Sequence, residues 1–274
     1  MPNILDKYQR QPKLYIDLPS KGRWYPNGIL TKSEEVAVYS MTASDEIATK
    51  TPDALFSGNT VASIISNCVP DISNAWDIPS VDMYSILAAI RMASYGDSIN
   101  MQSACAECIE DNTYEINLQS ILDYFTNTTF IETCKVGNIT FNISPISYKT
   151  FSDINKIQFK LQRQVAQVIP KIDDDENQAE EMQKIYDQLS ELRFQSVCNS
   201  ISSIEIEEEK ESNFDKILNF LKNSEKDFYN KVEETIIKNN NVWTVPPSEV
   251  QCAACDHKYN LDLELDYSNF FDER

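Results

Sequence analysis

The stretch VQCAACDHKYNLDLEL (residues 250–265) places Cys252 and Cys255 in a Cys-x-x-Cys spacing. This spacing brings two thiolates onto one tight turn, where they supply half of the ligands of a tetrahedral zinc site. A second pair, Cys105 and Cys108, stands in CAEC earlier in the chain. We therefore predict that the two pairs share one structural Zn²⁺ and that this ion clamps the C-terminal tail to the N-terminal half of the chain.

Each cysteine pair is followed by residues that alternate between apolar and polar. Residues 114–118 (YEINL) follow the first pair, and residues 259–263 (YNLDL) follow the second. The two segments align if the connection after the first pair is two residues longer. Alternation of this kind is typical of strands, so each pair is predicted to form one knuckle of a zinc-ribbon-like site. The knuckles are separated by residues 109–251, so the site is split.

Two other interpretations of the cysteines remain open, namely redox pairs and unpaired structural thiols. A redox Cys-x-x-Cys normally begins a helix, whereas both pairs here precede strand-like sequence. His257, the single histidine, either replaces a thiolate, lies beside the ligands or stands on the surface. The other three cysteines stand alone and are predicted to be small buried hydrophobes. They are Cys68, Cys134 and Cys198.

Composition limits the classes of function. The chain has 274 residues, 42% of them hydrophobic, which is ample for a core. Its formal charge of −19 disfavours nucleic acid, whose binding depends on lysine and arginine neutralising phosphates. No apolar run is long enough to cross a bilayer, and residues 1–13 lack the apolar centre of a signal peptide. We therefore expect a chain that is cytosolic where it is made, binds neither nucleic acid nor membrane, and acts on protein partners.

The pattern of residues predicts an α+β fold in four parts. Residues 1–102 form a small mixed domain, with strands in 13–41 and a clear helix at 81–95. Residues 103–145 hold the first knuckle and strands, and residues 241–274 hold the second knuckle and a C-terminal strand.

Between them, residues 146–240 are predicted to be a large helical insertion. Apolar residues recur at helical spacing in 151–169 and 179–197, which predicts an antiparallel helical hairpin. Acidic residues 205–212 follow as a link, and residues 213–238 give two further helices. The apolar faces are expected to pack within the chain, with a coiled-coil dimer as the alternative.

The sequence gives almost no support for catalysis. One histidine leaves no independent imidazole to activate a nucleophile, and no glycine-rich phosphate loop is present. Four thiolates would also leave Zn²⁺ no open position for water or substrate. The chain is therefore expected not to be an enzyme.

An ordered set of N-terminal segments resembles one known family. The set is LPSKGRWYP (residues 18–26), SMTASDE (40–46), IISNCV (64–69) and VDMYSILAAIRMASYG (81–96), followed by the first cysteine pair. In that order these segments are similar to the T4-type bacteriophage baseplate hub subunit and baseplate hub assembly protein family.

The resemblance implies a non-enzymatic protein that helps to assemble the central hub of a contractile-tail baseplate, as a hub component or an assembly chaperone. Its partners would be other baseplate hub or tail proteins. It would be found in the cytoplasm of the infected bacterial host during assembly and in the virion tail baseplate.

Trp24 and Tyr25 are candidate partner-binding residues because aromatic side chains on a constrained loop dominate many interfaces. The alternative is that both rings cap the domain's own core. Two other classes of function remain open. One is a zinc-ribbon regulator that contacts nucleic acid or polymerase, and the other is a thiol oxidoreductase.

Overall fold

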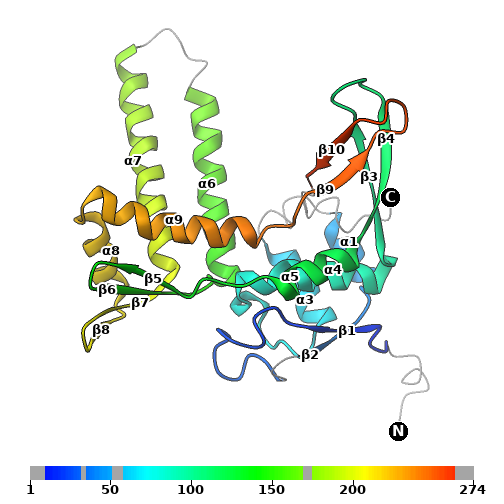
Figure 1. Cartoon of the computed structure of the whole chain (residues 1–274), viewed down its shortest axis with the longest axis horizontal. Coiled ribbons are helices and arrows are strands. Elements are labelled where there is room, and N and C mark those ends of the chain that lie inside the picture. Colours follow the sequence, from blue (N-terminus) through cyan, green and yellow to red (C-terminus); the bar gives the residue numbers. More distant parts are fainter. Residues whose placement is uncertain (1–9, 32–34, 51–57, 169–174, 263–274) are drawn as a thin grey trace. The chain divides into compact units, whose positions relative to one another are not determined.

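The computed structural model describes residues 10–31, 35–50, 58–168 and 175–262, and it is a mixed α+β structure as predicted (Figure 1). The chain forms two compact units. Unit 1 is built from residues 1–128 and 242–274, and unit 2 from residues 129–241. No helix among the described residues combines the length and apolar character that a bilayer crossing needs.

Unit 1 begins with an antiparallel pair of short strands, as the alternating residues in 13–41 predicted. Helices and two hairpins follow. The strands are β1 (Leu14–Asp17) and β2 (Glu35–Val38), and the helices are α1 (Ala43–Thr49), α3 (Asn59–Cys68), the short 3₁₀ helix η2 (Ala75–Asp77), α4 (Ser80–Tyr95) and α5 (Leu118–Asn127).

Helix α4 forms the centre of unit 1. Ten of its sixteen residues are buried, including an unbroken run from Ser85 to Arg91. It ends at Gly96, whose φ of 98° is a conformation that glycine adopts without strain. Phe125 of α5 stacks between Tyr84 of α4 and Trp243, so the chain segment that returns to unit 1 packs on these two helices.

Two β-hairpins complete unit 1, and each forms its own antiparallel two-stranded sheet. The first pairs β3 (Ser98–Ala104) with β4 (Asp111–Asn117), and the second pairs β9 (Ser248–Gln251) with β10 (Lys258–Leu261). Figure 1 shows the second hairpin, in orange and red, beside the first.

Unit 2 contains a four-stranded antiparallel sheet in the order β5-β6-β7-β8. The strands are β5 (Thr133–Val136), β6 (Ile139–Ile143), β7 (Ile201–Ile206) and β8 (Glu209–Glu211). Helices α8 (Phe214–Lys222) and α9 (Lys226–Val242) contribute to the same apolar core as the sheet. Phe141 is completely buried in this core, next to Phe228.

The expectation of an all-helical insertion over 146–240 is wrong, because β7 and β8 lie within it. Ile201 and Ile204 face the core, and β7 pairs with β6, a partner distant in sequence. The acidic segment 205–212, predicted to be a link, contributes the end of β7 and the whole of β8. Strands β5 and β6, expected beside the first knuckle, belong to unit 2.

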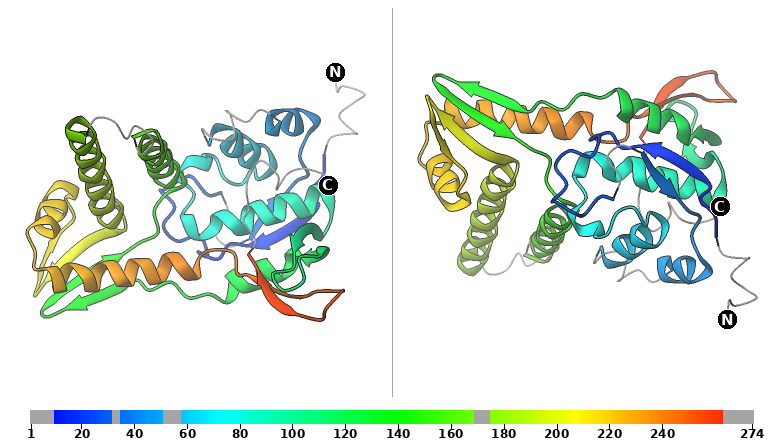
Figure 2. Two further views of the ribbon diagram at one scale, coloured as in Figure 1. Left: turned by 90° about the horizontal axis from the view of Figure 1, so that it is seen from above. Right: turned by 90° about the horizontal axis from the view of Figure 1, so that it is seen from below.

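The predicted helical hairpin is present as α6 (Tyr148–Val168) and α7 (Asp175–Asn199), which lie side by side in Figures 1 and 2. Leu161, Ile185 and Leu192 are buried between them. This seam satisfies the apolar stripes within one chain, as expected.

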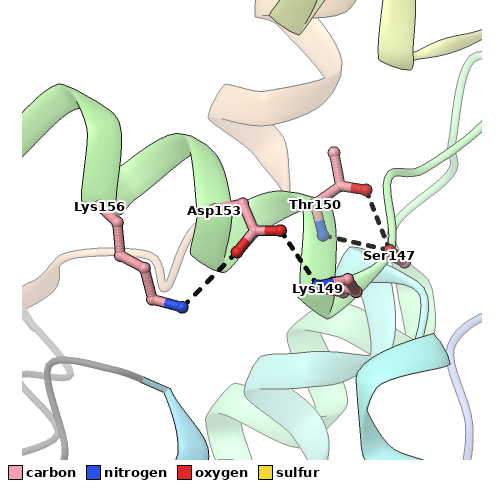
Figure 3. A network of polar contacts seen from close by, with 5 residues as sticks. All are labelled: Ser147, Lys149, Thr150, Asp153 and Lys156. Atoms are coloured by element: carbon pink, nitrogen blue, oxygen red, sulfur yellow. Dashed lines mark hydrogen bonds and ion pairs between the residues drawn. The ribbon is translucent and has the colours of Figure 1, made fainter.

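Ser147 and a set of side chains one turn apart fix the start of α6 (Figure 3). The hydroxyl of Ser147 accepts a hydrogen bond from the backbone N–H of Thr150 at 3.2 Å. Asp153 forms ion pairs with Lys149 at 3.3 Å and with Lys156 at 3.5 Å. All three ion-pairing side chains are largely exposed, so the pairs contribute little and the cap is the main local signal.

Candidate metal centre

The four cysteines of the two Cys-x-x-Cys pairs come together in unit 1. Their sulfur atoms all lie within 4.8 Å of one another, and they are Cys105, Cys108, Cys252 and Cys255. The Sγ atoms of Cys105 and Cys255 are 3.7 Å apart, and those of Cys108 and Cys252 are 3.6 Å apart. Each of these two contacts joins one hairpin to the other.

This spacing fits a tetrahedral zinc ion. Zn–S bonds of about 2.3 Å at tetrahedral angles place neighbouring sulfurs about 3.8 Å apart. The two closest sulfur contacts are within about 0.2 Å of that value. Among the described residues, these cysteines are the one group of side chains arranged closely enough to hold a metal ion.

The two knuckles have the same backbone conformation. In the first, the N–H of Ile109 donates to the carbonyl of Cys105 at 2.8 Å, and in the second the N–H of Asp256 donates to that of Cys252 at 3.0 Å. Both donors have positive φ angles, 64° at Ile109 and 58° at Asp256. A left-handed residue directly after the second cysteine therefore closes each turn.

The connections between the strands are equal in length, so the predicted two-residue difference is wrong. The first knuckle joins the pair Ala104 and Asp111, and the second joins Gln251 and Lys258. Each interval holds six positions. The alignment by tyrosine failed because those residues occupy different positions along their strands.

Tyr114 and Tyr259 nevertheless meet. Their hydroxyl groups are 3.1 Å apart, and their rings pack edge to face with centroids separated by 6.0 Å. Because one belongs to β4 and the other to β10, this contact joins the two hairpins below the cysteines.

Asn112 is a functional candidate that the sequence did not indicate. Its Oδ1 accepts from the N–H of Ala253 at 3.1 Å, and its Nδ2 lies 3.5 Å from the sulfur of Cys252. The side chain comes from β4 and contacts the second knuckle, and it is 9% exposed. Groups that contact metal ligands in this way orient them. No local motif distinguishes this asparagine, because its role depends on the approach of the other hairpin.

The thiols differ in their proton affinity. The backbone N–H of Ala254 is the main group that lowers the pKa of Cys252, to about 6. The backbone N–H of His257 lowers the pKa of Cys255, but the thiol of Cys108 and its neighbours together raise it to about 12. Thiols bind zinc as thiolates, so binding of the ion would release their protons.

The remaining candidates occupy other positions. His257 stacks on Tyr259 and is not part of the sulfur cluster. The three isolated cysteines are buried, as predicted, and they are Cys68, Cys134 and Cys198.

The loop that carries Trp24 and Tyr25 is held by Asp82 of α4. The hydroxyl of Tyr25 donates to Asp82 at 2.9 Å, and Ser20 donates to the same carboxylate through its backbone N–H at 2.7 Å. Burial raises the pKa of Tyr25. The guanidinium of Arg23 lies 4.4 Å from the centre of the Trp24 ring. Tyr25 therefore has an internal structural role, and a role for Trp24 in partner binding stays a prediction.

Comparison with known families decides the class of protein. The family described as T4 bacteriophage base plate protein matches residues 14–272. The chain belongs to this family. The match includes both cysteine pairs and both units of the baseplate protein. No curated protein and no solved structure is significantly similar to it.

Membership gives the general role. The baseplate protein is a structural protein of a phage tail, located in the virion tail baseplate, and its partners are other tail proteins. The segments 18–26 and 81–96, which carried the resemblance, contact each other through Ser20, Tyr25 and Asp82. These two segments of the resemblance therefore form a structural contact within unit 1.

Proposed function

We propose that this baseplate protein acts in the assembly of the central hub, as a hub component or an assembly chaperone, and that it does so by binding other tail proteins. The observation that carries the proposal is the family match over residues 14–272. The ordered N-terminal segments that resemble hub subunits and hub assembly proteins support the finer assignment. The protein works in the cytoplasm of the infected host while the baseplate forms.

The proposal includes no enzymatic activity and no binding of nucleic acid or membrane. One histidine, stacked on Tyr259, is the whole imidazole content of the chain. The net charge of −19 opposes binding to nucleic acid and to anionic lipid surfaces alike.

The second part of the proposal is that the four thiolates hold a structural Zn²⁺ in a split, zinc-ribbon-like site. The sulfur spacing and the matched knuckles support it. Zn²⁺ bound by four thiolates offsets half of their negative charge and has no coordination position left for substrate. Its role would be to join the β3–β4 hairpin to the β9–β10 hairpin, as a clamp between segments distant in sequence.

The test is to remove the gene from the phage and to analyse the particles by mass spectrometry and electron microscopy. Loss of the hub in the deletion, restored by the wild-type gene, is the expected result. Presence of the protein in both virions and assembly intermediates identifies a hub component, whereas presence in intermediates alone identifies a chaperone. Complete baseplates in the deletion would refute the proposal.

A further inference from the structure

Unit 1 contains a groove, about 680 Å³ in volume, that the metal site does not use. Its lining residues come from β1, α4 and α5 and from positions next to them. Leu14, Met92 and Leu122 are among its apolar lining residues.

Among the described residues, β1 pairs with β2 on one edge and with no strand on the other, outer edge. Tyr15 lies opposite Ala37 of β2, but the N–H of Ala37 donates away from β1, to Asp71 at 3.0 Å. Tyr15 and Ala37 are therefore a pair without mutual hydrogen bonds, which directs the backbone N–H and C=O of Tyr15 away from β2. No described residue forms a backbone hydrogen bond with Tyr15 on that outer side. Asp17, two residues further, has the same orientation.

Ser85 supplies a second, independent observation. This α4 residue lines the groove and is 2% exposed, and its hydroxyl has no hydrogen-bond partner within the described part of the chain. A buried hydroxyl without a partner is unfavourable, so such groups usually have one. A polar group that enters the groove would supply it.

The charges around the groove indicate the chemistry of the occupant. Three carboxylates line it, from Asp17, Asp97 and Asp123, against the single amine of Lys13. All four residues are exposed. The excess of negative charge favours a positively charged partner.

We propose that the groove receives an extended segment of another tail protein, carrying lysine or arginine, which adds as a third strand to the outer edge of β1. The backbone of Tyr15 and Asp17 would hold the segment, and the carboxylates would select its basic side chains. The proposal deepens the assembly function proposed above, and it rests on that function for the source of the segment.

The test uses two labelled, capped hexapeptides, one of alternating lysine and valine and one with glutamate in place of lysine. Fluorescence anisotropy measures their binding to the full-length, zinc-loaded chain. The lysine peptide should bind at least about tenfold more tightly than the glutamate peptide at low salt, and added salt should narrow the difference. Equal affinities would overturn the proposal.

Two substitutions separate backbone pairing from the side chain. Tyr15→Pro removes the outward N–H, which an edge strand tolerates, and should weaken the lysine peptide about tenfold. Tyr15→Thr keeps the N–H and should bind as the wild type does. If Tyr15→Pro does not fold, hydrogen exchange at the amides of Tyr15 and Asp17 in the wild type decides the question. The peptide should slow exchange at both amides, and unchanged exchange would overturn the proposal.

A matched pair of variants tests the charge. Asp123 accepts a hydrogen bond from Gln119 at 2.9 Å, and Asp187 of α7 accepts one from Gln183 at 2.8 Å, also four residues earlier. Asp123→Asn should weaken the lysine peptide about threefold, whereas Asp187→Asn should have no effect. Equal effects of the two changes would refute the assignment of charge selection to the groove.

Other occupants give different results, and each would overturn the proposal. A concentration-dependent dimer that Tyr15→Pro abolishes would identify a second copy of the chain. Peptide binding that appears only after residues 263–274 are removed would identify the chain's own C-terminal segment. If the hub is lost on gene deletion but is fully restored by a gene that carries Tyr15→Pro, strand addition at the groove is refuted, whereas the proposed assembly function is supported.

Discussion

Replacing Cys105 and Cys252 with serine, separately and together, tests whether one metal ion joins the two hairpins. Cys105 follows β3 and Cys252 follows β9, so each change removes a ligand from a different half of the site. If both sulfurs bind the same ion, either change empties the site, and the second change has little left to remove.

The expected size follows from mass action. An ion that binds only the folded chain stabilises it by about 4 kcal/mol when free zinc is about 1,000 times its dissociation constant. Each single variant should lose most of this stabilisation, about 4 kcal/mol. The double variant should also lose about 4 kcal/mol. Two independent half-sites would instead give a loss equal to the sum of the singles.

Tryptophan fluorescence provides the assay, because it reports on unit 1 alone. The chain has three tryptophans, at positions 24, 76 and 243, and all belong to unit 1. Unfolding by urea, followed through this signal in zinc-buffered solution, gives the free energy for each variant. Elemental analysis of the same samples gives the metal content, expected at about one zinc ion per chain in the wild type.

Cys134→Ser is the matched control. Cys134 is a buried thiol of unit 2, and its sulfur lies 3.7 Å from the backbone carbonyl of Lys231. This variant should keep its zinc and show the wild-type fluorescence transition. An additive double variant, or wild-type protein whose stability does not depend on zinc, would show that the two pairs do not share an ion.

Three further predictions concern Asn112, Asp82 and the net charge of the chain. Asn112→Ala should weaken zinc binding about 10- to 100-fold in a chelator competition, because it leaves the knuckle amide of Ala253 without its acceptor; an unchanged affinity would contradict the role given to Asn112. Burial raises the pKa of Asp82 from 3.8 to about 6, so the folded chain binds this proton more tightly than the unfolded chain, and stability falls as the pH rises through that interval. The free energy of unfolding of Asp82→Asn minus that of the wild type should therefore increase by about 3 kcal/mol from about pH 3 to pH 7. A difference that stays constant with pH would refute the raised pKa. The chain should not retard DNA or RNA in a gel at low salt because its net charge is −19, whereas salt-sensitive retardation would favour the nucleic-acid regulator.

Features fixed by neighbouring residues could be predicted from the sequence. The Cys-x-x-Cys spacing, the apolar periodicity of α4 and α6, and the end of α4 at Gly96 all depend on nearby residues. The sequence could also pair CAEC with CAAC, because a tetrahedral ion needs four ligands and the chain offers one other suitable pair.

Features that depend on distant contacts could not be predicted. The acidic residues after Ile204 do not have the composition of a strand, so β7 and β8 were not predicted. Strand β7 forms by pairing with β6, which lies some 60 positions earlier, as in the contact of Asn142 with Ser203 (a separation of 61). Asn112 is one polar residue among many until the second knuckle lies against it. Alternating strands also fix no register by themselves, which is why the tyrosines misled the alignment.

The discontinuity of unit 1 has a consequence for synthesis. Cys108 and Cys252 are 144 positions apart. At elongation rates of about 5–20 residues per second, the ribosome adds Cys252 roughly 7–30 s after Cys108. All of unit 2 is made in that interval, so its continuous chain can fold while the first pair of thiols still lacks the second. A chain that terminates early inside unit 2 has only two of the four cysteines. If the proposed zinc site forms, tight tetrahedral coordination would therefore separate completed chains from truncated ones at the moment of folding.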